Sequence, residues 1–368
     1  MSMDRLITLH QPKRLEIGAG SCAKLGEMEA ARPLVIASRP TAQYVDRLGL
    51  SGQLLVIDDV PPEPDLPAFQ SVLERARAHR PDLVVGMGGG SVLDITKLVA
   101  CLWDSGQSLR EVVGPNRIQG RRTALVQVAT TAGTGSEAGI RALVTDPETK
   151  SKLAVESPYM IADLAVLDPE LTYSVPPAVT AATGVDAMAH CVEAFTNIHA
   201  HDLVDGYARM GISLVGRYLK RAVADGTDTE ARAGMMLASY YGGICLGPVN
   251  TAAGHALAYP LGTRLSLPHG LANAIIFPHV LAYNAPAARA KTAEVAQALG
   301  LAAQGDLTAE AVGFCRELGI EMRLSVHGAK ETDLSRYAED AHAIRRLMDN
   351  NPREMSVADV LAIYRNAF

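Results

Sequence analysis

Four side chains in the second half of the sequence have the types and spacing of metal ligands. Asp186 and His190 lie four positions apart in GVDAMAHCVEAF, so a helix would place both on one face. His255 and His269 lie in GHALAYPLGTRLSLPHG, where we expect Pro260 to stop a helix and the chain to return towards His255. One carboxylate and three imidazoles suit Fe(II), Zn(II), Co(II) or Ni(II), and no thiolate selects among these ions. The alternative is a local Asp–His salt bridge with structural histidines.

Two glycine-containing segments in the first half are candidates for binding a nucleotide. The first, DLVVGMGGGSVLDITK at residues 82–97, combines an apolar strand, a glycine cluster and a helix, which presents backbone N–H groups to a phosphate. It lacks the strict G-x-G-x-x-G spacing, since Ser91 stands at the last glycine position, and it is not a P-loop. The second, ATTAGTGSE at residues 129–137, places hydroxyl groups beside flexible glycines after the next strand. Either segment alone is typical of a polar turn, but the pair predicts a dinucleotide site.

Alternating strands and helices are predicted to position these two segments. Short apolar runs predict buried strands at residues 33–38, 53–60, 82–87 and 123–129. Residues 65–79 have apolar side chains at helical spacing behind a capping Asp65, and residues 91–103 are similar. Strands and helices in alternation predict a parallel sheet covered by helices on both faces.

The character of the sequence then changes. A second group of short strands is predicted at residues 142–146, 152–155 and 165–167. Pro176 and Pro177 interrupt the chain, and strand alternation ends there. Alanine-rich stretches of helical length occupy residues 178–196, 203–224 and 229–246. We therefore predict an α/β dinucleotide-binding domain at residues 1–178 and an all-helical metal-binding and substrate domain at residues 179–368, with the site in the cleft between them.

The composition excludes several classes of protein. The chain of 368 residues is 48% hydrophobic and 20% charged, which is typical of a globular enzyme. A formal net charge of −6 without runs of like charge argues against nucleic acid and membrane surfaces as partners. The five cysteines include no C-x-x-C pair, and no apolar run has the length of a membrane span. We expect a soluble cytoplasmic protein with reduced thiols.

Four motifs together resemble a known family. GGGSVLDITK, TTAGTGSE, GVDAMAHCVEAF and HALAYPLGTRLSLPHGLANAIIFPH look like successive signatures of the iron-containing (group III) alcohol dehydrogenases, in their order and in their separation. The resemblance implies that family's dehydroquinate synthase-like architecture, with a parallel nucleotide-binding sheet followed by an all-α domain. It also implies a metal-dependent alcohol dehydrogenase or aldehyde reductase that transfers hydride between the nicotinamide C4 of NAD or NADP and a small alcohol or carbonyl.

The resemblance assigns roles to individual residues and implies a homodimer. The metal ligands would be Asp186, His190, His255 and His269. Fe(II) is the favoured ion and Zn(II) the alternative. The cofactor site would be lined by Gly88, Gly89, Ser91, Asp94, Thr130, Thr131 and Thr134.

Two positions depart from the pattern of many family members. Tyr259 stands where many have a further histidine that is thought to relay a proton. A phenol is a poorer shuttle than an imidazole at neutral pH, but its hydroxyl can hold water or the substrate oxygen; His279 is the second candidate for this role. After the strand at residues 33–38, Ser38 and Arg39 replace the carboxylate that would bind the adenosine ribose, so the site permits NADP(H).

The substrate and the exact subfamily stay open. Arg141, Lys152 and Arg264 lie near the motifs and are candidates for binding a carboxylate, phosphonate or sulfonate, or in the case of Lys152 the cofactor; the alternative for each is a surface charge. Within the superfamily, the alternatives are a zinc-using glycerol dehydrogenase type and a metal-free maleylacetate reductase type, which the intact ligand set opposes. A non-catalytic nucleotide-binding protein is the alternative from another class.

Overall fold

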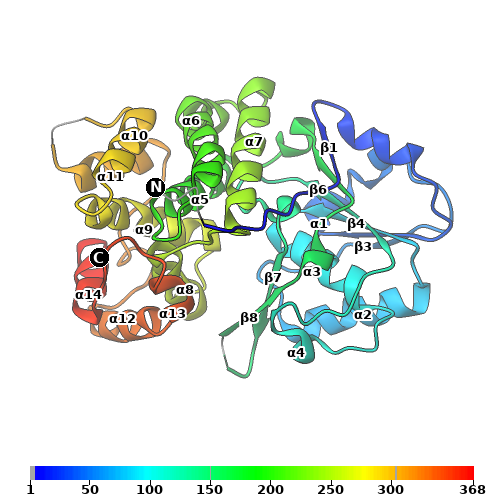
Figure 1. Ribbon diagram of the computed structural model, residues 1–368. Coiled ribbons are helices and arrows are strands. Elements are labelled where there is room, and N and C mark those ends of the chain that lie inside the picture. Colours follow the sequence, from blue (N-terminus) through cyan, green and yellow to red (C-terminus); the bar gives the residue numbers. More distant parts are fainter. Residues whose placement is uncertain (1–4, 150, 303–304) are drawn as a thin grey trace. The chain divides into compact units, whose positions relative to one another are not determined.

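The computed structural model describes residues 5–149, 151–302 and 305–368, which divide into two compact units (Figure 1). Leu9–Ser174 form the first unit, and Val175–Phe368 together with residues 5–8 form the second. Within the described residues, every strand belongs to the first unit, and the second is built from helices. The predicted fold class, a parallel α/β unit followed by an all-α unit, is confirmed.

A six-stranded sheet forms the centre of the first unit, and every neighbouring pair of its strands is parallel. Its order is β1 (Arg14–Ile17), β9 (Leu164–Leu167), β6 (Ala124–Ala129), β4 (Leu83–Gly88), β2 (Pro33–Ala37) and β3 (Leu55–Ile57). The central strands are buried along their length, because both faces are covered. Leu34 and Val84 pack towards α2 (Leu66–His79) and α3 (Gly90–Leu102), while Val35 and Val85 belong to the opposite core.

Some of the remaining elements of this unit follow the predictions. The Asp65 side chain caps α2 by accepting a hydrogen bond from the Ala68 amide at 2.9 Å, as predicted. The predicted strands at 142–146 and 152–155 are β7 (Arg141–Asp146) and β8 (Ser151–Glu156), an antiparallel pair in a separate small sheet with β5 (Gly114–Pro115). Two short helices complete the unit: α1 (Arg39–Ala42) and α4 (Leu109–Val112); these two and β5 were not predicted.

Helices of the second unit pack around small and apolar side chains. The three long stretches predicted as helices are α5 (Pro177–Thr196), α6 (Asp202–Ala224) and α7 (Thr229–Leu246). They are followed by α8 (Ala253–Leu265), α9 (His269–Asn284), α10 (Arg289–Leu299), α11 (Leu307–Glu317), α12 (Leu334–His342), α13 (Arg345–Met348) and α14 (Val357–Asn366). A second core joins α8 and α9 to α12 and α14. No described helix combines the length and the apolar character needed to cross a membrane.

The prediction that Pro260 stops a helix is wrong. Helix α8 continues through Pro260 to Leu265, and Ser266 then ends it in the left-handed conformation at φ 56°. A proline removes one amide donor and disturbs the carbonyls of the preceding turn. Here the Tyr364 hydroxyl, from α14, donates to the Leu257 carbonyl at 2.6 Å, and the buried apolar face of α8 holds the helix in the core. The turn that returns His269 therefore lies after Leu265 rather than at the proline.

Candidate functional site

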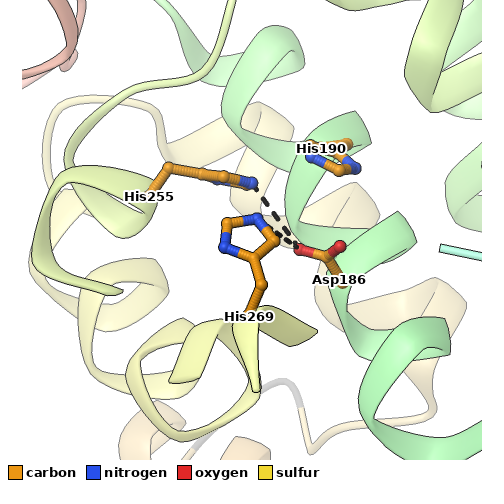
Figure 2. Close-up of side chains that lie close together, drawn as sticks. All are labelled: Asp186, His190, His255 and His269. Atoms are coloured by element: carbon orange, nitrogen blue, oxygen red, sulfur yellow. Dashed lines mark ion pairs between the residues drawn. The ribbon is translucent and has the colours of Figure 1, made fainter. Parts of the chain in front are cut away.

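Three helices bring the four predicted ligands together in the second unit (Figure 2). Asp186 and His190 lie one turn apart on α5, His255 lies in the first turn of α8, and His269 is the first residue of α9. The candidate ligand atoms all lie within 4.8 Å of one another. From Asp186 Oδ1, the distance is 3.6 Å to His255 Nε2 and 3.8 Å to His269 Nε2. We call these four residues the Asp–His cluster.

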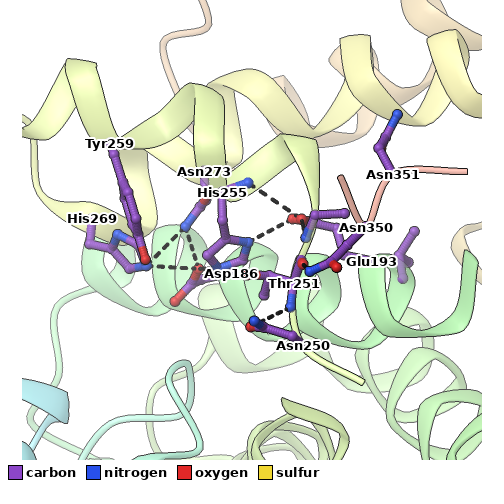
Figure 3. Close-up of polar contacts among 12 residues, drawn as sticks. Asp186, Glu193, Asn250, Thr251, His255, Tyr259, His269, Asn273, Asn350 and Asn351 are labelled. Carbon is purple, nitrogen blue, oxygen red and sulfur yellow. Dashed lines mark hydrogen bonds and ion pairs between the residues drawn. The ribbon is translucent and has the colours of Figure 1, made fainter. Parts of the chain in front are cut away.

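A buried carboxylate orients one imidazole of the cluster. Glu193 Oε1 lies 2.6 Å from His255 Nδ1, and Glu193 Oε2 accepts hydrogen bonds from the backbone amides of Ala252 and His255 (Figure 3). Because the carboxylate accepts, the proton of the neutral ring sits on Nδ1. His255 Nε2 therefore presents a lone pair towards Asp186.

Burial and mutual electrostatics set the charges of the cluster. Burial alone would raise the pKa of Asp186, but the neighbouring imidazoles and the Asn273 amide lower it, so the carboxylate is ionised. Burial lowers the pKa of His190 to about 4, which leaves its ring neutral at neutral pH. Burial would lower the pKa of His255 as well, but Glu193 and Asp186 raise it, partly opposed by the charge of Arg346.

The cluster fits a divalent metal ion. His255 Nε2 is a buried atom that has no hydrogen-bond partner among the described residues, although it faces a carboxylate oxygen 3.6 Å away. A neutral His255 ring would set a lone pair against an anionic oxygen, so the site favours a cation at Nε2, which is either the proton that the raised pKa favours or a metal ion. One carboxylate oxygen and three imidazole nitrogens are a ligand set that Fe(II) and Zn(II) accept. The residues present therefore match the predicted metal.

Asn273 joins two members of the cluster from the next turn of α9. Its Nδ2 donates to Asp186 Oδ1 at 2.7 Å and lies 3.1 Å from His269 Nε2 (Figure 3). The amide is buried, so its position is fixed by packing. Asn273 thereby holds the Asp186 carboxylate in its orientation.

The two candidates for proton transfer lie in different surroundings. Tyr259, on α8, has its ring centre 6.0 Å from that of His269, so it lies beside the cluster (Figure 3). His279 lies ten residues beyond His269 on α9 and is not part of the cluster. It is 7% exposed, and burial lowers its pKa to about 4.

The predicted nucleotide segments meet at one edge of the first unit's sheet. Strands β2, β4 and β6 are parallel neighbours, so their carboxyl ends place Ser38, Gly89 and Thr130 side by side. The Thr130 amide donates to the Gly88 carbonyl at 3.0 Å. Helix α3 then begins at Gly90 without a side-chain cap, which leaves its first N–H groups for an anion.

Close packing between the two segments explains their glycines. A Cβ atom on Gly89 would lie 3.0 Å from Thr131 Oγ1, and one on Gly90 would lie 2.7 Å from Thr134 Cγ2. Both values are shorter than an ordinary contact between such atoms, so a larger residue would push the second segment away. Gly89 and Gly90 therefore pack directly against Thr131 and Thr134 of the second segment.

Asp94 is engaged within the protein rather than open to a ligand. Its carboxylate accepts hydrogen bonds from Ser136 Oγ at 2.5 Å and from the Leu143 amide at 2.9 Å, and it forms an ion pair with Lys97 at 3.1 Å. Lys97 also donates to the Ser136 and Arg141 carbonyls. Asp94 and Lys97 thus hold the second segment against α3.

Lys152 lies near the first segment but is paired. It forms an ion pair with Glu63 and donates to Thr145 Oγ1 at 2.9 Å. The Glu63 amide donates in turn to Ser91 Oγ at 3.1 Å, which links Lys152 to the start of α3. Its charge is therefore partly neutralised by a neighbour.

The two arginines considered for an anionic substrate are also paired. Arg141 forms an ion pair with Glu156 at 2.6 Å, and Arg264 forms one with Asp340 at 2.8 Å. Their charges are compensated within the protein, and Arg141 lies in the first unit, which does not contain the Asp–His cluster.

Sequence reasoning missed the residues that support the cluster. Glu193 lies three positions after His190, and Asn273 lies four positions after His269, so helical spacing alone could have indicated both. Arg346, on α13, acts on His255 through its charge but comes from a distant part of the chain, and no spacing signal connects it with the cluster.

Comparison with known proteins gives a consistent result. Residues 12–169 match the family model described as iron-containing alcohol dehydrogenase, and residues 180–368 match the C-terminal model of the Fe-containing alcohol dehydrogenase family. The chain is 37% identical over 324 residues to long-chain-alcohol dehydrogenase 1 of Geobacillus thermodenitrificans, covering 85% of this chain and 82% of that protein.

Two solved structures have the same fold over nearly the full chain. A crystal structure of 1,3-propanediol oxidoreductase aligns with a TM-score of 0.92 and 30% identity, over 99% of this chain and 100% of the other. Sulfoacetaldehyde reductase from Bifidobacterium kashiwanohense, solved in complex with NAD+, aligns with a TM-score of 0.88 and 25% identity, over 99% of each chain.

Proposed function

Since the chain belongs to the iron-containing alcohol dehydrogenase family, we propose that its Asp–His cluster holds a divalent metal ion at which a small alcohol is oxidised or an aldehyde reduced. The protein is an NAD(P)-linked oxidoreductase that acts on CH–OH groups. The observation that carries the proposal is the unpartnered His255 Nε2, which faces the Asp186 carboxylate at 3.6 Å. We favour Fe(II), with Zn(II) as the alternative.

The chain's own residues prepare this chemistry. A divalent ion supplies a Lewis acid that polarises the carbon–oxygen bond of the substrate. Glu193 keeps the Nε2 lone pair of His255 available, and Asn273 orients the Asp186 carboxylate. In the reducing direction, a bound nicotinamide would supply the hydride for the carbonyl carbon, and a proton would be added to the oxygen. We assign the Tyr259 hydroxyl to hold that oxygen or a water molecule beside it, with solvent replacing the proton.

The cofactor is assigned to the carboxyl ends of β2, β4 and β6. The pyrophosphate would meet the start of α3, where Gly89 and Gly90 allow close approach. Ser38 directly follows β2 and offers no carboxylate, and the exposed Arg39 comes next. We propose that this pair accepts the 2′-phosphate of NADP(H).

One experiment tests the metal and the cofactor together. The anaerobically purified protein is analysed for bound metal, and NADH and NADPH oxidation is followed with small aldehydes before and after chelation. We expect turnover to be lost with the metal and restored by Fe(II) or Zn(II), and His269→Ala to remove it. His201→Asn is the matched control, because it removes an imidazole while keeping a cap for the Leu203 amide. Activity that survives both chelation and His269→Ala would favour the metal-free maleylacetate reductase type.

We also propose a cytoplasmic homodimer. All five cysteines are buried and unpaired, which suits a reducing compartment. Leu203 and Met210 lie seven positions apart on one face of α6 and are 49% and 43% exposed, so they are candidates for the subunit interface. Light scattering of the wild type and of Leu203→Glu tests this; a monomeric wild type would contradict it.

A further inference from the structure

An arginine side chain lies over the tyrosine beside the Asp–His cluster. Arg346, on α13, has its guanidinium carbon 5.6 Å from the centre of the Tyr259 ring, and its Nη2 lies 3.4 Å from the Tyr259 hydroxyl. The same ring lies 6.0 Å from the His269 imidazole. A single aromatic side chain therefore separates a permanent positive charge from a predicted metal ligand.

The charge of Arg346 has no carboxylate partner within the described part of the chain. No acidic oxygen there lies within 4.0 Å of its guanidinium, and the side chain is exposed. The adjacent Arg345 differs, since it pairs with Asp349 on the next turn. Arg264, on α8, pairs with Asp340. Arg346 is thus a cation near the cluster that spends one donor on the Tyr259 hydroxyl and has no acidic partner among the described residues for the others.

The backbone of Arg346 is fixed relative to the cluster. Asn350 is buried, and its side-chain amide donates to the Arg346 carbonyl at 3.1 Å and to the Thr251 carbonyl at 2.8 Å. Thr251 lies two residues before α8, the helix that carries His255 and Tyr259. One amide therefore ties the backbone of Arg346 to the segment before the helix that contributes a ligand, and this fixes the point from which the guanidinium extends.

We propose that Arg346 binds an anionic group of the substrate, so that the enzyme acts on short aldehydes or alcohols that carry a carboxylate, sulfonate or phosphonate. This inference rests on the proposed function of the Asp–His cluster. A guanidinium presents N–H donors that match the oxygens of such anions, and the contact with Tyr259 engages only Nη2 among them. Because the Arg346 guanidinium carbon and the His269 ring lie 5.6 Å and 6.0 Å from the centre of the same tyrosine ring, the proposal requires a short carbon chain between anion and carbonyl.

Matched substrates and matched variants test the proposal with the metal-loaded enzyme. We would measure kcat/KM for succinic semialdehyde, sulfoacetaldehyde and phosphonoacetaldehyde against the neutral propanal and butanal. The variants are Arg346→Ala, Arg346→Lys and, as control, Arg345→Ala, which removes the same charge from the adjacent position. We expect Arg346→Ala to lose about 10- to 100-fold more kcat/KM on the preferred anionic substrate than on neutral ones, because a charge-assisted hydrogen bond to the anion is lost. Arg346→Lys should recover part of the loss.

A binding readout separates this inference from the proposed function. Butanal reduction is measured with three anions as competitive inhibitors: ethanesulfonate, acetate and methylphosphonate. We expect inhibition by at least one of them to be lost in Arg346→Ala but kept in Arg345→Ala. Equal losses on anionic and neutral aldehydes, or equal effects of the two alanine variants, would overturn the inference while leaving the dehydrogenase assignment intact. A wild type that turns over no aldehyde with either nicotinamide would instead overturn the proposed function, and this inference with it.

Discussion

Glu193 Oε1 lies 2.6 Å from His255 Nδ1, and both side chains are buried. Carboxylates that accept from the outer nitrogen of a ligating histidine fix its tautomer and strengthen it as a ligand. Glu193 also accepts from the first amides of α8, so it sets the position of the helix as well as the state of the ring. The strength of metal binding should therefore depend on a residue that is not itself a ligand.

A substitution of Glu193 tests whether metal affinity depends on its carboxylate. Glu193→Gln keeps an oxygen that can accept from Nδ1 but removes the negative charge, and we expect metal affinity to fall about 10- to 100-fold. Competition with a chelator, followed by metal analysis, measures the change. Glu317→Gln is the control, because Glu317 is an exposed carboxylate that pairs with Lys220. Equal metal retention in the two variants would show that Glu193 does not support the ligand.

A single residue at the end of β2 should change the choice of nicotinamide. Ser38→Asp introduces a carboxylate where the adenosine ribose is assigned, and aspartate remains a good cap for α1. We expect the ratio of kcat/KM for NADPH to that for NADH to fall by about 10-fold or more, since a carboxylate repels a 2′-phosphate. Ser38→Asn, which caps without the charge, serves as control. An unchanged ratio in Ser38→Asp would place the ribose elsewhere.

Stability at low pH should depend on Asp163, which precedes β9. Burial would raise the pKa of Asp163, but hydrogen bonds from Arg121, Lys13 and the Leu125 amide lower it from 3.8 to about 2. A lowered pKa stabilises the fold above the unfolded value, and this contribution is lost as pH falls from about 4 to about 2.

Asp163→Asn should therefore reduce the free energy of unfolding by about 2 kcal/mol at neutral pH, and by progressively less as pH falls below about 4. Urea unfolding followed by the fluorescence of Trp103, the only tryptophan in the sequence, reports on this unit. Asp59→Asn, at an exposed pair with Arg75, is the control. A loss that does not depend on pH would mean that packing rather than charge is responsible.

Glu137 should have the opposite dependence on pH. It lies in the second nucleotide segment, and burial raises its pKa from 4.5 to about 7, with its own backbone amide and Lys97 partly opposing the rise. A raised pKa means that stability is fully present below the unfolded value and is lost as pH rises through the folded value.

Glu137→Gln should accordingly be more stable than the wild type by up to about 3 kcal/mol at pH 8 and nearly equal to it at about pH 4. The same Trp103 fluorescence measurement detects the change. A variant that is less stable at both pH values would show that the buried carboxylate forms a favourable interaction when ionised.

Local sequence patterns predicted most of the elements and named the four residues that meet in the Asp–His cluster. Apolar runs gave β2, β4 and β6 within one or two residues, and Asp65 caps α2 as predicted, because these features depend on neighbouring residues. The prediction that Pro260 ends the helix failed because Tyr364, over a hundred positions away, donates a hydrogen bond to a carbonyl in the turn before the proline. The ion pair between Lys152 and Glu63 is also non-local. The sequence pattern named Lys152 as a candidate for binding the cofactor, but it could not indicate that Glu63 compensates its charge.

The contact between Arg346 and Tyr259, on which the proposed substrate class rests, could not be predicted from the sequence. Arg346 gains its significance only from Tyr259, which lies 87 positions earlier in the chain. Asn350 ties the backbone of Arg346 to Thr251 by donating to both carbonyls. Residue spacing in the sequence cannot predict hydrogen bonds of this kind. Contacts of this kind depend on the packing of α13 against α8, and that packing follows from the whole core.

The bond from Tyr364 to the Leu257 carbonyl also bears on protein engineering. It joins α14 to the turn of α8 that lies between His255 and Tyr259. Libraries that randomise α14 to improve expression would therefore also sample small rotations of the two residues on α8, and selectivity changes are to be expected among their members. Conversely, substitutions around Tyr364 provide a route to adjusting the enzyme's substrate range without replacing any residue that touches the substrate.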